Sequence, residues 1–121
     1  MSFYAAFNSG FVGGADFATE DWNHISPYGA WSAGRDNMLP GLQLLHSPGV
    51  FLHGVIQTVE DMSVRFATFD VAVVVATSRV STYTTPDGIT HANTRERRTF
   101  VVVKRSGRWL VMQDQATTVG G

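Results

Sequence analysis

Three side chains in this sequence could transfer a proton or hold an oxyanion, and His46 is the first. It lies four residues after Leu42 and seven after Leu39, so it shares the apolar face of the helix predicted around it. An imidazole in a mostly apolar pocket could move a proton near neutral pH. The alternative is a histidine that interacts with the free carbonyl groups at the helix C-terminus.

Arg79 and Asp114 are the other two candidates. Arg79 follows a long apolar run and shares a strand face with Thr77 and Ser81, so its guanidinium could hold a carboxylate or enolate oxygen of a ligand. Asp114 lies near the end of the last predicted strand, and in an apolar site its raised pKa would make it a candidate base. The alternatives are a charge at the solvated end of a strand and an ordinary surface aspartate.

Five further residues are candidates for ligand binding. Gln113 and Gln115 share the strand face opposite to that of Asp114 and could offer amide hydrogen bonds if that face is the inner one. Tyr28 and Trp31 flank a predicted turn, where they could form a lid or pack the hairpin onto the following helix. His24 precedes this hairpin and could reach the rim of a pocket, although simple packing is the alternative.

The sequence also argues against several kinds of chemistry. It contains no cysteine, which excludes disulfides, thiolate nucleophiles and thiolate metal sites. The four histidines lack the spacing of a metal site, so no metal is expected. There is no phosphate-binding glycine motif and no Gly-x-Ser-x-Gly nucleophile elbow. We therefore expect no cofactor.

The elements that position these candidates begin with helices. Phe3, Ala6 and Phe7 share one face of a first short helix, which Asn8-Ser9-Gly10 ends. A second short helix is predicted for residues 12–21, and a hairpin around residues 28–29. A further helix is predicted for residues 37–46, with Asp36 or Asn37 as its cap and Pro40 in its first turn. Arg35 precedes it, and we expect a structural role in which it pairs with Asp36 or Asp21.

Long extended segments follow. They are predicted for residues 51–59, 64–83, 91–105 and 109–119, with turns at Glu60-Asp61, at residues 85–88 and at Ser106-Gly107. Helices followed by an antiparallel meander are typical of an α+β domain with its helices on one face of a curved sheet. A chain of 121 residues is expected to form a single domain.

The run Val71–Ser78, with the sequence VAVVVATS, does not alternate as a strand covered on one side would. The chain offers no second set of helices, and only 16% of its residues are charged. We therefore infer a homodimer through the back of the sheet. The alternative is a monomer in which a long loop covers a central strand.

Charge and hydropathy bear on partners and location. The net charge of −1 gives no overall reason to bind nucleic acid or an anionic membrane. Six of the nine basic residues cluster between positions 95 and 108, which favours a solvated rim or a protected sheet edge over a nucleic-acid site. There is no secretory signal and no apolar run long enough to cross a bilayer. The expected location is the cytoplasm.

Three passages together resemble a known family: PYGAWSAGRDNML, SVRFATFDVAVVVATSRVS and RRTFVVVKRSGRWLVMQDQATTV. They are similar to the SnoaL-like group of the nuclear transport factor 2-like superfamily, whose members are often called ketosteroid-isomerase-like. The similarity extends from about Asn8 to Val119. It implies a cone-shaped half-barrel, in which a strongly curved, mostly antiparallel sheet holds N-terminal helices in its concave face and encloses an apolar cavity.

The resemblance implies function only broadly. Relatives include ketosteroid isomerases, polyketide cyclases, epoxide hydrolases and dehydratases, together with proteins that only bind ligands or scaffold others, and they are commonly dimers. We expect a small hydrophobic ligand, and acid–base chemistry on a carbonyl compound if the protein is an enzyme. The alternative is a non-catalytic ligand-binding or dimerisation domain.

This chain departs from the group in two respects. Its first helix begins almost at residue 1 and is shorter than usual, so one wall of the cavity is expected to be thin or supplied differently. It has no complete match to the isomerase set of a tyrosine donor, a carboxylate base and a second carboxylic acid, nor to the Asp-Arg-Asp set of the epoxide hydrolases.

Overall fold

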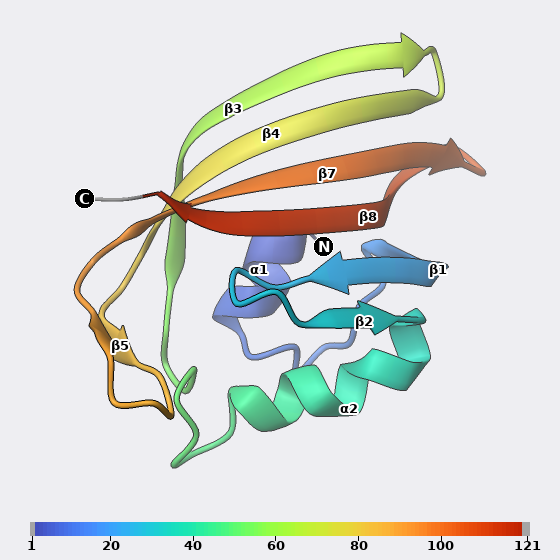
Figure 1. Cartoon of the computed structure of the whole chain (residues 1–121). Helices are drawn as coiled ribbons and strands as arrows, with labels where there is room; N and C mark the ends of the chain where they lie inside the picture. Colours follow the sequence, from blue (N-terminus) through green and yellow to red (C-terminus); the bar gives the residue numbers. More distant parts are fainter. Residues whose placement is uncertain (1, 120–121) are drawn as a thin grey trace.

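A computed structural model describes residues 2–119 of the chain and confirms the α+β class (Figure 1). The helices are α1 (Phe3–Asn8) and α2 (Arg35–Leu45). The strands are β1 (Ala18–Ile25), β2 (Trp31–Ala33), β3 (Gln57–Thr68), β4 (Val71–Val80), β5 (Tyr83–Thr84), β6 (Thr90–His91), β7 (Arg95–Arg105) and β8 (Arg108–Val119). No helix in the described part of the chain is long and apolar enough to span a membrane.

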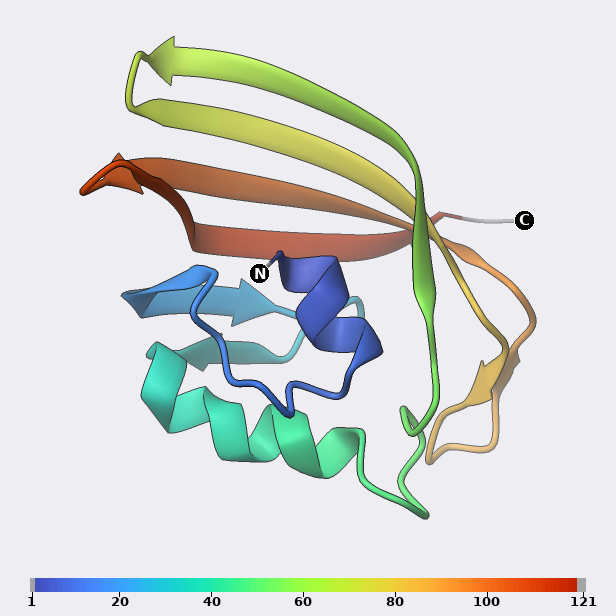
Figure 2. The ribbon, with the colours of Figure 1, turned by 180° about the vertical axis from the view of Figure 1, so that it is seen from behind.

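The main sheet has six strands in the order β2-β1-β8-β7-β4-β3, and β5 and β6 form a separate small hairpin. All neighbours in the main sheet are antiparallel except β1 and β8, which run parallel. The sheet curves strongly, and β3 and β4 bend away from the other strands at one end (Figure 2). Helix α1 lies inside this curve, and α2 packs against β1 and β2, as expected for a cone-shaped half-barrel.

The turn predicted at Ser106-Gly107 is present, and the one predicted at Glu60-Asp61 is not. Ser106 and Gly107 both have positive φ, as a tight two-residue hairpin requires. The chain at Glu60 instead forms a bulge, where the register of β3 against β4 shifts between Val59 and Asp61. Because a bulge bends a strand without ending it, β3 continues through this polar pair to Thr68. The predicted segments 51–59 and 64–83 are therefore wrong in their bounds, since residues 51–54 form a turn and a second turn at Phe69-Asp70 separates β3 from β4.

The second helix predicted for residues 12–21 is wrong. Gly10 and Phe11 both adopt positive φ, which stops α1 and redirects the chain through turns. Strand β1 then begins at Ala18. Phe11 is nevertheless almost completely buried, so this segment is held by packing against the core instead of by helical hydrogen bonds.

Helix α2 begins two residues earlier than predicted. Gly34, with φ of 88°, is the N-cap residue and no side chain caps the helix. Asp36 and Asn37 cannot act as caps because they already lie inside the first turn. Pro40 therefore falls in the second turn and not the first, where its missing N–H interrupts the hydrogen-bond ladder.

Arg35 has the structural role that its position predicted. Its Nε lies 2.9 Å from Asp36 Oδ1, and its Nη1 donates to the Ala18 carbonyl oxygen at 3.2 Å. The side chain thus joins the start of α2 to the start of β1.

The core lies between the concave face of the sheet and the helices. It contains the predicted apolar face of α1 (Phe3, Ala6, Phe7) together with Phe11, Phe17, Trp22 and Phe100. Strand β4 is apolar on both sides: Ala72 and Ala76 point inward and are buried, whereas Val73 and Val75 point outward and are half-buried. The non-alternating run therefore places apolar side chains on both faces of β4.

The short α1 leaves part of the concave face uncovered. An apolar cleft of about 350 Å³ lies under the far end of β3 and β4, where Met62, Val64, Phe66 and Trp109 line it. Phe66 and Trp109 meet edge to face at 5.9 Å, yet both side chains remain exposed. This exposed cleft lies beside α1, where Phe3 and Tyr4 also line it.

Candidate functional site

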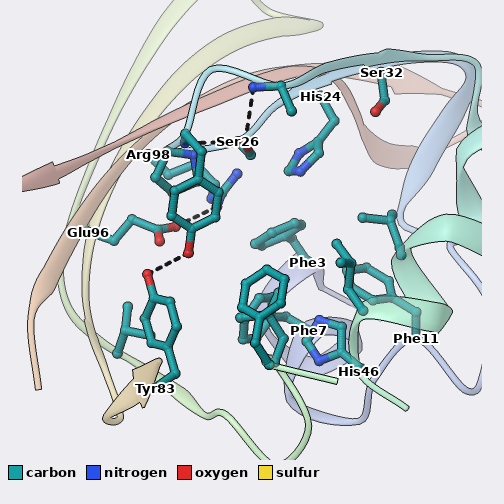
Figure 3. A pocket seen from close by; sticks show the side chains of 18 residues that line it. Phe3, Phe7, Phe11, His24, Ser26, Ser32, His46, Tyr83, Glu96 and Arg98 are labelled. Carbon is teal, nitrogen blue, oxygen red and sulfur yellow. Dashed lines mark hydrogen bonds and ion pairs between the residues drawn. The ribbon is translucent and has the colours of Figure 1, made fainter. Parts of the chain in front are cut away.

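A cavity of about 270 Å³ opens inside the cone, between α1, α2, the β1–β2 hairpin and the start of β7 (Figure 3). Most of its wall is aromatic or aliphatic, with Phe3, Phe7, Phe11 and Phe51 as the largest groups. Its polar side chains are His24, Ser26, Tyr28, Ser32, His46, Tyr83, Glu96 and Arg98. It is an apolar chamber with a few hydrogen-bonding groups, as ligand pockets usually are.

His24 is positioned by the parallel pairing of β1 with β8, which places it beside Asp114 on the inner face. His24 Nδ1 lies 2.9 Å from Asp114 Oδ2 and 3.1 Å from Oδ1. Because the carboxylate can only accept, Nδ1 carries the hydrogen, and Nε2 of a neutral ring is left with a free lone pair. The ring lines the cavity, and within residues 2–119 only its Nδ1 takes part in a hydrogen bond. This is the geometry of a general base held by a carboxylate.

Asp114 lies fully buried behind His24 and receives three donors. Trp22 Nε1 donates to Oδ1 at 2.7 Å, His24 donates through Nδ1, and Arg98 Nη1 donates to Oδ2. Burial alone would raise the pKa of Asp114, but the hydrogen bond from His24 and the charge of Arg98 outweigh it and hold the pKa below its usual value. The expected raised pKa is therefore wrong, and Asp114 is a stable anion.

Arg98 connects this pair to a second carboxylate. It is 2% exposed, its Nη2 donates to Glu96 Oε1, and its guanidinium stacks over the Phe3 ring at 4.3 Å. Its Nε has no hydrogen-bond partner among the described residues. Glu96, Arg98 and Asp114 thus form a buried carboxylate–guanidinium–carboxylate group. It differs from the Asp-Arg-Asp set mentioned in the sequence analysis because a glutamate replaces one aspartate.

Sequence reasoning missed Glu96 and Arg98 because the basic run 95–108 was interpreted as a solvated rim. A signal was present, since Glu96 and Arg98 lie four and two residues before Phe100. Residues at i, i+2 and i+4 share one face of a strand, and Phe100 belongs to the core. A charged pair in phase with a core aromatic indicates buried charges and not a rim.

Two tyrosines meet at the other side of the cavity. Tyr28 Oη donates to Tyr83 Oη at 2.6 Å, and the Tyr83 ring stacks on His91 with centroids 4.8 Å apart. Burial raises the pKa of both phenols, that of Tyr28 further because of its bond to Tyr83. Both hydroxyls therefore keep their protons near neutral pH. Tyr28 lies at the cavity, as its position beside the turn predicted.

His46 lines the cavity as an apolar wall residue. It is 8% exposed and its ring meets the rings of Phe7 and Phe11 edge to face at 4.6 and 5.5 Å. Burial lowers its pKa, although a hydrogen bond with the Leu52 backbone opposes this, so the ring is uncharged near neutral pH. It is also the C-cap residue of α2, where its backbone N–H donates to the carbonyl oxygens of Gln43 and Leu44.

Four predicted site residues lie outside the cavity. Arg79 is on the outer face of β4 and its Nε pairs with Glu60 Oε2 at 3.4 Å. Gln113 and Gln115 also point outward, because strand alternation gives the inner face to Asp114 between them. Trp31 is 72% exposed on the three-residue edge strand β2. The expectation that these four side chains line the cavity is corrected.

No group of three or more acidic or histidine side chains among residues 2–119 has an arrangement that could hold a metal ion. The polar groups of the cavity instead bind one another. What the arrangement offers chemically is one held imidazole, two neutral phenols and one carboxylate oxygen against apolar walls. That set suits acid–base chemistry or the recognition of an oxygen-bearing ring compound.

Comparison with solved structures identifies the fold. No family model and no curated protein sequence matches the chain. Among solved structures, an uncharacterised protein with a cystatin-like fold from Caulobacter vibrioides shares 22% identity with a TM-score of 0.87, over 98% of this chain and 82% of that one.

Two further structures show the range of proteins with this shape. A putative scytalone dehydratase from Novosphingobium aromaticivorans shares 16% identity with a TM-score of 0.72, over 97% of this chain and 76% of that one. A putative calcium/calmodulin dependent protein kinase II association domain from Xanthomonas campestris shares 22% identity with a TM-score of 0.70, over 96% and 79%. At such identities similarity establishes architecture alone, and the chain has the cystatin-like α+β fold.

Proposed function

We propose that the protein is a SnoaL-like, ketosteroid-isomerase-like protein that binds a small hydrophobic carbonyl compound in the cone and moves a proton on it with His24. The observation that carries the proposal is the His24–Asp114 pair, in which a buried carboxylate orients an imidazole whose free nitrogen lies at an apolar cavity. An isomerase, cyclase or lyase of this type needs no cofactor.

The proposed step begins when His24 Nε2 takes a proton from the carbon next to the carbonyl group. The electron pair of the broken C–H bond forms a carbon–carbon double bond, and the π pair of the carbonyl group moves onto its oxygen. Asp114 stabilises the imidazolium that forms. Tyr83 accepts a hydrogen bond from Tyr28, so its own hydroxyl hydrogen is available to the developing oxyanion. The imidazolium then returns the proton at another position.

This assignment moves the proton-transfer role from His46 to His24. His46 lies among phenylalanine rings, and no carboxylate appears among the groups that shift its pKa. Asp114 keeps a part in the chemistry but acts through His24, since it is completely shielded from the cavity by its three donors.

The test uses 2-tetralone, a neutral two-ring ketone, as a general probe of proton abstraction. The protein is expected to accelerate exchange of its α-hydrogens with deuterated solvent, as followed by proton NMR. A positioned base typically contributes about 100-fold or more, so His24→Gln should reduce the exchange rate by about that factor. His53→Gln, at an exposed histidine, is the matched control and should leave the rate unchanged.

The alternative function is a non-catalytic ligand-binding or dimerisation domain. The mostly apolar lining of the cavity favours simple binding, and one structural neighbour is described as an association domain. If 2-tetralone binds without faster exchange, the binding role replaces the catalytic one. If exchange is accelerated but His24→Gln leaves it unchanged, the catalytic residue is misassigned.

We also propose that two copies associate through the outer face of the sheet. Val71, Val73 and Val75 of β4 pair with Val103, Val101 and Thr99 of β7. The five valines make an outward apolar strip of half-buried side chains, which the exposed Thr99 ends. A second copy would cover this strip symmetrically. Val75→Lys should then convert a dimer to a monomer in sedimentation velocity, while Val64→Lys on the concave side should not. A monomeric wild-type protein would contradict the proposal.

A further inference from the structure

The buried charges at the cavity do not favour an anionic ligand. Glu96, Arg98 and Asp114 are 5%, 2% and 0% exposed and sum to a charge of −1. His24 adds either nothing or one positive charge, so the group is negative or neutral and never positive. His46, the remaining titratable wall group besides the tyrosines, is held uncharged by burial.

The single arginine at the cavity cannot compensate for an incoming anion. Both of its terminal nitrogens already donate to carboxylates, Nη1 to Asp114 and Nη2 to Glu96. Arg98 Nε has no partner among the described residues, but the charge of the guanidinium is already balanced by the two carboxylates. A ligand carboxylate would therefore lose its hydration on entry and meet a group whose net charge is negative or neutral. The set of polar groups at this wall therefore disfavours carboxylates, whatever the reaction.

Glu96 has a free oxygen that faces this space. Only its Oε1 takes part in a hydrogen bond within the described residues, while the side chain lines the cavity (Figure 3). A carboxylate oxygen can only accept, so its best partner on a ligand is a hydroxyl group that donates. The rings of Phe3, Phe7 and Phe11 form apolar walls of the same cavity that suit a flat ring.

We propose that Glu96 determines the ligand class of the cavity: it selects an uncharged ring compound whose hydroxyl donates to Glu96 Oε2, and it excludes carboxylates. This inference rests on the proposed function in so far as the cavity is the ligand site. It does not depend on whether a reaction follows. Its readout is therefore binding and not turnover.

The test compares three ring compounds of similar size by calorimetry near neutral pH: 2-naphthol, 2-methoxynaphthalene and 2-naphthoate. The wild-type protein is expected to bind 2-naphthol about tenfold or more tightly than either of the others, since one lacks the donor and one carries a negative charge. Equal affinity for 2-naphthoate, or no binding of 2-naphthol up to its solubility, would overturn the proposal.

Glu96→Gln removes the charge and places an amide donor beside the cavity while Arg98 keeps its partner Asp114. We expect this variant to bind 2-naphthoate about tenfold more tightly than the wild type and to lose most of its preference for 2-naphthol. Glu60→Gln, at an exposed glutamate on the opposite side of the sheet, is the matched control and should behave as wild type. If Glu96→Gln does not fold, the affinities of the wild-type protein for the three ring compounds still test the proposal.

The two proposals fail in different ways. Tight binding of 2-naphthol over 2-naphthoate without hydrogen exchange on 2-tetralone would remove the catalytic function and leave the ligand class intact. Exchange that depends on His24, combined with equal binding of 2-naphthoate, would remove the role of Glu96 and leave the catalytic function intact.

Discussion

Trp22 Nε1 donates a hydrogen bond of 2.7 Å to Asp114 Oδ1, and both side chains are completely buried. The two residues are 92 positions apart, and β1 and β8 bring them together. The bond supplies one of the donors that keep the carboxylate charged inside an apolar core, and it holds the oxygen that His24 also approaches.

Removal of this donor should destabilise the protein. A hydrogen bond to a charged group contributes about 1.5–3 kcal/mol, and the smaller ring leaves unfilled space, so Trp22→Phe should lower the free energy of unfolding by at least about 2 kcal/mol. Urea denaturation followed by circular dichroism measures this. Trp31→Phe changes an exposed indole and should cost no more than about 0.5 kcal/mol. Equal effects of the two substitutions would contradict the role of the buried bond.

Stability should fall in acid because of Asp114. Its folded pKa lies below the unfolded value of about 3.9, so the unfolded state binds more protons between the two values. The contribution is fully present above the unfolded pKa and is lost as the pH falls through the folded pKa. Urea denaturation over a series of acidic buffers should show this loss in the wild type, and much less of it in Asp114→Asn.

Asp36→Asn is the control for this experiment. The hydrogen bond from Arg35 also lowers the pKa of Asp36, but the side chain is exposed and salt screens the interaction. In high salt its acid profile should follow that of the wild type. An unchanged profile for Asp114→Asn as well would show that Asp114 does not govern acid stability.

All three tyrosines should resist ionisation in the folded protein. Burial raises the pKa of Tyr4 to about 12 and raises the pKa of Tyr28 and Tyr83 as well. The absorbance of tyrosinate should therefore stay flat while the pH rises past 10, where unfolded tyrosine ionises. Because the folded values are higher, this stability is present below about pH 10 and is lost as the pH rises through the folded values. A native tyrosine that titrates near 10 would contradict the burial.

Gly10 should be sensitive to substitution because of His46. Its φ is +70°, and a Cβ there would lie 3.1 Å from His46 Cβ. Gly10→Ala is expected to lower the free energy of unfolding by about 1–2 kcal/mol and to displace the His46 ring. Chemical shifts of the imidazole protons and urea denaturation measure the two effects.

The matched control lies in α2. Gly41 is helical, and a Cβ there would meet nothing within 4 Å. Gly41→Ala should therefore stabilise the protein by about 0.5–1 kcal/mol, since alanine loses less conformational freedom on folding. A destabilising Gly41→Ala would show that backbone conformation at these glycines does not decide the outcome.

The sequence was informative wherever the signal was local. The apolar spacing of Phe3, Ala6 and Phe7 predicted α1 and its buried face, and Ser106-Gly107 predicted the tight turn between β7 and β8. It failed where two local signals competed. Gly34 starts α2 before Asp36 can cap it, and the polar pair at Glu60 marks a bulge where a turn was expected.

The candidate site was harder to predict from the sequence, for a physical reason. Alternation shows that Gln113 and Gln115 lie opposite Asp114, but it does not say which side is the inside. Arg79 and Arg98 both lie beside apolar runs on strands. The spacing of Arg98 from Phe100 hints at an inner position, but the direction in which the sheet curves decides which face of each strand is the inside.

By itself, then, the sequence determined the class of the fold, the last two long strands and the presence of apolar side chains on both faces of β4. Short-range spacing encodes these properties. The tertiary structure alone decided that His24, Arg98 and Asp114 meet, because the parallel pairing of β1 with β8 and the curvature of the sheet bring together groups up to 90 residues apart. Charges buried in this way depend on partners that no local pattern can specify.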